Sequence, residues 1–108
     1  MQMGIDDRMT REVVRRVLTV AKPDRIILFG SAARAEMTRD SDIDLLILDP
    51  TSEDTRKKSV LIGDALRGLG FPFDVIVMRT ARFEETKEVI GGIAHPASRH
   101  GRAIYEAS

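Results

Sequence analysis

Three aspartates in apolar surroundings are the residues of this sequence best suited to chemistry. Asp42 and Asp44 flank Ile43 in the run DIDLLIL. Side chains alternate along a strand, so both carboxylates are expected on one face and Ile43 on the other. Two neighbouring carboxylates repel each other, which raises the pKa of at least one of them. A divalent cation would offset this repulsion, and hard oxygen ligands favour Mg²⁺ or Mn²⁺.

Asp74 is a third carboxylate of the same kind. It stands near the start of the apolar run FDVIV, well after Asp44 in the chain. The intervening segment is long enough for a helical crossover that returns the chain to a neighbouring strand. Aspartates on adjacent strands would form a platform for two metal ions. The sequence therefore predicts that Asp42, Asp44 and Asp74 are metal ligands.

A glycine and a serine after another apolar run supply the complementary half of such a site. Arg25–Phe29 is typical of a buried strand, and Gly30 with Ser31 would turn that strand into a helix. Glycine lets the backbone approach a ligand closely, and the free N–H groups of a helix start, with the Ser31 hydroxyl, bind anions. Arg34 falls on the first turn, within reach of a phosphate. Phosphates held here and bridged by Mg²⁺ to the aspartates describe a nucleoside-triphosphate site.

Helices and strands in alternation must position these residues. Apolar spacing and turn residues predict helices at residues 6–21, 31–37, 53–69 and 80–89, and strands at 25–29, 42–48 and 73–78. A helical turn at 96–99 and an extended tail at 103–105 follow. This order implies an α/β (α+β) fold, with a small mixed sheet and helices packed against it.

The helix boundaries follow from capping residues. The expected N-caps are Asp6 or Asp7 for the first helix, Ser52 for the third and Thr80 for the fourth. Phe83 and Ile90 are expected on one face of the fourth helix, two turns apart.

Composition excludes several classes of protein. Basic and acidic residues number 17 each, a formal net charge of zero, which argues against direct nucleic-acid binding and polybasic membrane binding. The absence of cysteine excludes disulfides and thiolate metal sites. No membrane span or signal peptide is visible, so one cytoplasmic domain over residues 1–108 is expected. His95 and His100 lack metal-ligand spacing and are interpreted as partly exposed loop residues.

The combined motif resembles a known family. Gly-Ser, ten residues, Asp-x-Asp and a later lone aspartate, in the wording LFGSAARAEMTRDSDIDLLIL, are similar to the minimal nucleotidyltransferases (MNT) of the polymerase beta superfamily. The resemblance is strongest over residues 26–48, continues at 71–78 and includes the ending GRAIYE. It implies a nucleotidyltransferase fold.

The resemblance also implies an activity. A nucleoside monophosphate, AMP from ATP, would move to a hydroxyl acceptor. Gly30 and Ser31 would hold the triphosphate, Asp42 and Asp44 would bind two Mg²⁺ ions, and Asp74 would complete the catalytic site and help deprotonate the acceptor. Small members of this family are often paired with a HEPN-domain toxin. The implied role is an antitoxin that adenylylates a tyrosine of its toxin.

Other interpretations stay open at this point. Asp42 and Asp44 also fit a solvated strand face, and Asp74 fits a residue at a strand start paired with an arginine. Arg34 also fits a surface salt bridge. The chain could neutralise a toxin by binding alone, without catalysis. It could instead modify a small molecule, although such enzymes usually carry an added helical domain.

Overall fold

Helices and strands alternate along the part of the chain that the computed structural model describes, residues 6–30, 42–51 and 53–107. They are α1 (Asp7–Val20), β1 (Arg25–Phe29), β2 (Ile43–Asp49), α2 (Thr55–Ala65), β3 (Phe73–Arg79), α3 (Thr80–Thr86), α4 (Ala94–His100) and β4 (Arg102–Glu106). The expected helix at 31–37 lies outside the described residues. No described helix is long and apolar enough to cross a membrane.

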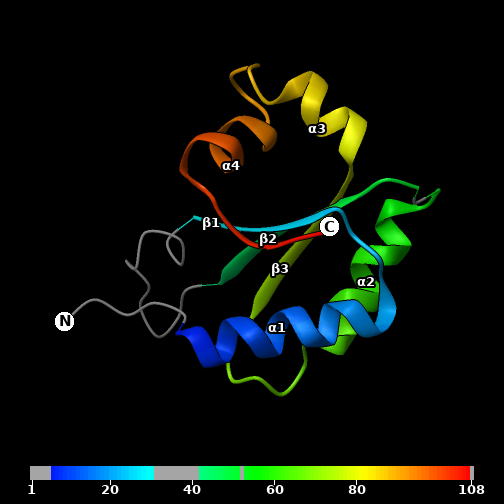
Figure 1. Ribbon diagram of the computed structural model, residues 1–108, viewed down its shortest axis with the longest axis vertical. Coiled ribbons are helices and arrows are strands. Elements are labelled where there is room, and N and C mark those ends of the chain that lie inside the picture. The colour runs from blue at the N-terminus through cyan, green and yellow to red at the C-terminus, as the bar shows by residue number, and fades with distance from the viewer. Residues whose placement is uncertain (1–5, 31–41, 52, 108) are drawn as a thin grey trace.

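The strands form one mixed sheet in the order β3-β2-β1-β4 (Figure 1). β1 runs antiparallel to both β2 and β4, whereas β2 and β3 are parallel. Parallel neighbours need a crossover, and α2 supplies it between β2 and β3. The expected α+β fold with a small mixed sheet is therefore confirmed, and the chain reaches β3 by the predicted helical route.

Helices cover both faces of the sheet. On one face, Val13 and Val17 of α1 and Ile62 of α2 pack against alternate residues of the strands. On the other face, Phe83 of α3 and Ala97 of α4 pack against the remaining alternate residues. β2 is consequently buried on both sides from Leu45 onward, as the apolar run predicts.

Several helix boundaries differ from those expected. Asp6 caps α1 as predicted, since its Oδ1 accepts a hydrogen bond from the Met9 amide at 2.8 Å. α2 begins after Asp54, which accepts a bond from the Lys57 amide at 3.0 Å, and the predicted cap Ser52 lies outside the described residues. α2 ends at Ala65, four residues early, because the chain turns through Gly68 and Gly70, both with positive φ.

The prediction for α3 was wrong in two respects. Thr80 does not cap this helix; its hydroxyl donates to Asp24 Oδ2 at 2.6 Å and ties α3 to the segment before β1. The helix also ends at Thr86, so Ile90 is 84% exposed and shares no face with the buried Phe83. Tertiary contacts outweigh local helical spacing here.

The C-terminal part is more ordered than expected. The predicted turn at 96–99 is the helix α4, and the tail at 103–105 is the edge strand β4. His95 and His100 therefore lie on α4, which corrects their interpretation as loop residues. Pairing of β4 with β1 explains the difference, because it contributes hydrogen bonds that local sequence patterns do not reveal.

We expect Gly101→Ala to destabilise the protein by about 1–3 kcal/mol. Gly101 ends α4, and a Cβ at this position would overlap the carbonyl oxygen of Ala97 and the Cγ2 of Ile27. Gly63→Ala on α2 is a matched control, because its Cβ would meet nothing within 4 Å and alanine favours a helix by about 0.5–1 kcal/mol. Denaturant unfolding measures both variants. Equal stability of Gly101→Ala and the wild type would contradict the close packing of α4 on β1.

Candidate active site at the acidic end of the sheet

Strand register brings two of the predicted aspartates side by side. Asp44, the second residue of β2, pairs with Asp74 on β3 and with Phe29 on β1. Directly opposed residues in a sheet project to the same face, so both carboxylates lie on the α3 and α4 side. Phe29 is the last residue of β1, and Gly30 follows it. Asp44 thus lies between Asp74 and the end of β1.

The electrostatics of Asp44 reflect its burial and the presence of the two other aspartates. Asp44 is half-buried, whereas Asp42 and Asp74 are exposed. Burial raises the pKa of the Asp44 carboxyl, and the nearby charges of Asp74 and then Asp42 raise it further. Ionisation of Asp44 in the folded protein therefore costs free energy, and a cation bound to the carboxylate would offset this cost.

Gly30 is in direct contact with this carboxylate. Its φ of +72° is unfavourable for any residue with a Cβ. A Cβ at this position would also overlap Asp44 Oδ2. The turn after β1 therefore requires glycine for two independent reasons, and the absence of a side chain lets the carboxylate lie against the backbone. Ser31 and Arg34, the other predicted phosphate contacts, lie outside the described residues.

The donor set fits magnesium in its chemistry. Mg²⁺ prefers oxygen ligands and usually takes one or two carboxylates, completing its shell with water and substrate phosphate. Among the described residues, no three histidine, aspartate or glutamate side chains already form a group that could hold a metal ion. Asp42 and Asp74 lie close enough to Asp44 to raise the pKa of its carboxyl, but the three carboxylates do not enclose a cation. Such an open arrangement is typical of magnesium sites in which a substrate phosphate supplies some of the ligands.

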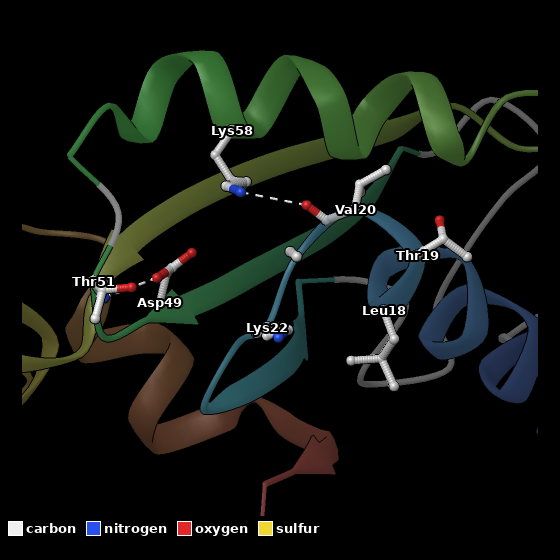
Figure 2. A pocket seen from close by; sticks show the side chains of 8 residues that line it. Leu18, Thr19, Val20, Lys22, Asp49, Thr51 and Lys58 are labelled. Carbon is white, nitrogen blue, oxygen red and sulfur yellow. Dashed lines mark hydrogen bonds between the residues drawn. The ribbon is translucent and has the colours of Figure 1, made fainter.

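A hollow of about 420 Å³ at the other end of the sheet is a separate feature (Figure 2). It lies beside Asp49, the last residue of β2, roughly 16 Å along the strand from Asp44. Asp49 is 4% exposed and accepts a hydrogen bond from the Thr51 amide at 2.9 Å. Lys58 Nζ donates to the Val20 carbonyl at 3.3 Å, next to the end of α1. These contacts support local structure, and no predicted site residue lines this hollow.

Sequence comparison defines the class of protein. The model of the nucleotidyltransferase domain family matches residues 8–94, which include Gly30, Asp42, Asp44 and Asp74. The chain therefore belongs to the nucleotidyltransferase domain family. No curated protein matches its sequence.

Solved structures support the same fold. A crystal structure of a toxin–antitoxin with AMP-PNP superposes with a TM-score of 0.67 at 19% identity, over 92% of this chain and 74% of that chain. A tri-AMPylated Shewanella oneidensis HEPN toxin in complex with MNT antitoxin gives a TM-score of 0.58 at 17% identity, over 91% of this chain and 70% of that chain. At these identities the likeness establishes a shared fold.

Proposed function

We propose that this chain is a Mg²⁺-dependent nucleotidyltransferase that moves AMP from ATP to a hydroxyl group of a partner protein. The observation that carries the proposal is the pairing of Asp44 with Asp74 beside the turn at Gly30. Asp42, Asp44 and Asp74 would hold two Mg²⁺ ions, and Gly30 with Ser31 and Arg34 would hold the triphosphate.

The chemistry divides between the ions and the chain. Bound Mg²⁺ neutralises charge on the triphosphate and lowers the pKa of the attacking hydroxyl. Asp42, just before β2, and Asp44, its second residue, would hold the cations that bind and orient the α-phosphate. Asp74, on the neighbouring strand, accepts the proton of the acceptor hydroxyl. The acceptor oxygen bonds to the α-phosphorus, the bond to the bridging oxygen of the β-phosphate breaks, and pyrophosphate leaves.

The site is open enough for an acceptor carried by another protein. Asp42 and Asp74 are both exposed. We propose a tyrosine of a HEPN-domain toxin as the acceptor, so that the chain acts as an antitoxin. Support comes from the fold shared with an MNT antitoxin that was solved with a tri-AMPylated HEPN toxin.

Intact-mass spectrometry of a HEPN partner tests this function. The partner is incubated with the chain, ATP and Mg²⁺, and a gain of one or more adenylyl groups is expected. Omission of Mg²⁺ controls for metal-independent labelling, and omission of the chain controls for non-enzymatic labelling. Replacement of ATP by α,β-methylene-ATP, in which the bond between the α-phosphorus and the leaving group is not cleaved, is expected to give no labelling. An unmodified partner in a complex that still neutralises toxicity would contradict transfer and favour inhibition by binding alone.

A further inference from the structure

The strand β3, which carries Asp74, forms one edge of the sheet. Among the residues that the structure describes, its only strand neighbour is β2, so its other side is an outer edge. Val75, Ile76 and Met78 are half-buried, whereas their partners on β2 are fully buried. A hollow of about 370 Å³ is lined by both Val77 and Met78. Consecutive strand residues project to opposite faces, so a hollow that reaches both residues lies at the outer edge and shows that it is open there.

One hydrogen bond determines which backbone groups of β3 point to the outer edge. The Ile43 amide donates to the Pro72 carbonyl at 2.8 Å, and Ile43 is paired with Phe73. In a parallel ladder a residue bonds to the two residues that flank its partner, so the backbone groups of Asp74 also point toward β2. Backbone groups of alternate residues point in opposite directions. The residues of β3 whose N–H and C=O groups point to the outer edge are therefore Phe73, Val75 and Val77.

β3 lacks the features by which edge strands avoid pairing. It has seven residues in unbroken register with β2 and contains no proline, glycine or lysine. β4, at the opposite edge of the sheet, has only five residues, and its register with β1 shifts between Ile26 and Ile27. Short and irregular edge strands resist an added strand, whereas a long and regular one accepts it. The edge that carries Asp74 is thus the one suited to strand addition.

We propose that the outer edge of β3 binds an extended segment of the acceptor protein as an added antiparallel strand, with the hydroxyl-bearing residue opposite Asp74. This inference rests on the proposed nucleotidyltransferase function and adds the surface on which the acceptor docks. The outer edge identifies its occupant by chemistry. A row of N–H and C=O groups at strand spacing is matched by the backbone of another extended segment.

Strand addition brings the acceptor residue to the reacting side of the sheet. Directly opposed residues project to the same face, so a residue opposite Asp74 shares the face of Asp74 and Asp44. The backbone groups of Asp74 point toward β2, which makes this a non-hydrogen-bonded pair, with Cβ atoms about 4.5–5.5 Å apart. The acceptor side chain therefore lies beside the carboxylate proposed to take its proton.

Residue-resolved hydrogen exchange of the chain, alone and bound to the HEPN partner, tests the proposal. In the chain alone, the amides of Val75 and Val77 should exchange fast because they point to the outer edge, whereas the Ile76 amide is protected by its bond to β2. In the complex we expect exchange of the Val75 and Val77 amides to slow about tenfold or more, while that of Ile76 changes little. Unchanged exchange of the two edge amides in the complex would overturn the proposal.

Val75→Pro provides a second test. Proline removes the N–H that points to the outer edge and leaves the bonds between β3 and β2 in place. We expect the KM for the partner to rise about tenfold, while the Kd for Mg-ATP stays within twofold of the wild type. Val75→Thr is the matched control, because threonine is also β-branched and keeps the N–H, and it should leave both constants within twofold.

The outcomes separate this inference from the function on which it rests. An unchanged KM for the partner in Val75→Pro, with Mg-ATP binding intact, would overturn strand addition and leave nucleotidyl transfer standing. Protection of the edge amides by a partner that is bound but never adenylylated would support the docking surface and contradict the proposed transfer. A partner that neither binds nor is modified would overturn both proposals.

Discussion

Asp44→Asn is expected to slow nucleotidyl transfer by about a thousandfold or more. The substitution keeps the shape of the side chain but removes the charge that would hold Mg²⁺ between β2 and the triphosphate. Asp44 is the half-buried member of the three aspartates and lies against Gly30, so neither exposed carboxylate can replace it. The rate of adenylyl transfer to the partner, followed by intact mass, measures the effect.

The same substitution should not destabilise the protein. The raised pKa of Asp44 means that the folded state binds its proton more tightly than the unfolded chain does. The free energy of unfolding therefore falls as pH rises from the ordinary pKa of 3.8 through the raised pKa, and the penalty is fully present above that window. Asp44→Asn removes the penalty. We expect its melting temperature to equal or exceed that of the wild type at neutral pH, with the difference vanishing below pH 3.8.

Asp64→Asn is the control for charge removal. Asp64 is exposed on α2 and pairs with Arg67 at 3.0 Å, a surface contact that contributes little to stability. Its loss should change neither transfer nor melting temperature appreciably. Transfer by Asp44→Asn within tenfold of the wild-type rate would show that Asp44 is not a metal ligand. Toxin neutralisation by an inactive but folded Asp44→Asn would assign the protective effect to binding alone.

Gly30→Ala is expected to damage both stability and activity. The backbone cost of φ +72° for alanine is about 1–2 kcal/mol, and the overlap of its Cβ with Asp44 Oδ2 adds to that cost. Either the turn or the carboxylate must shift, and a displacement near 1 Å in a catalytic site lowers the rate by about a hundredfold. Chemical denaturation and the transfer assay measure the two effects.

Gly68→Ala separates the two causes. Gly68 has φ +87° and a Cβ there would meet nothing within 4 Å, so this variant carries the backbone cost without the overlap. We expect Gly68→Ala to lose stability while keeping full transfer activity. If Gly30→Ala lost no more activity than Gly68→Ala, the contact between the glycine turn and Asp44 would have no role in the reaction.

Much of the sheet could be predicted because the sequence patterns that specify its strands lie within short stretches of the chain. Alternation in DIDLLIL indicates which side of β2 carries acid, and the length between Asp44 and Asp74 indicates a crossover. These two observations are enough to expect adjacent carboxylates. The register that pairs them residue for residue could not be read from the sequence, since a slip by one residue would place Asp74 on the opposite face.

The parts that could not be predicted depend on contacts distant in sequence. Thr80 matches a capping pattern, but its hydroxyl bonds to Asp24 instead. The tail at residues 102–106 has only a weak strand pattern of its own, and it becomes the edge strand β4 by pairing with β1. Similarly, the overlap that excludes a side chain at Gly30 becomes visible only when β1 and β2 are placed together.

Anomalous diffraction from crystals grown with Mn²⁺ and a non-hydrolysable ATP analogue is the most direct test of the site. It shows whether Asp42, Asp44 and Asp74 bind the metal ions that hold the nucleotide phosphates. Manganese favours the same hard oxygen ligands as magnesium. We predict anomalous peaks within about 2.2 Å of carboxylate oxygens of Asp44 and Asp42, with the triphosphate running toward Gly30. Manganese and analogue bound elsewhere, with these carboxylates left to solvent, would contradict the account.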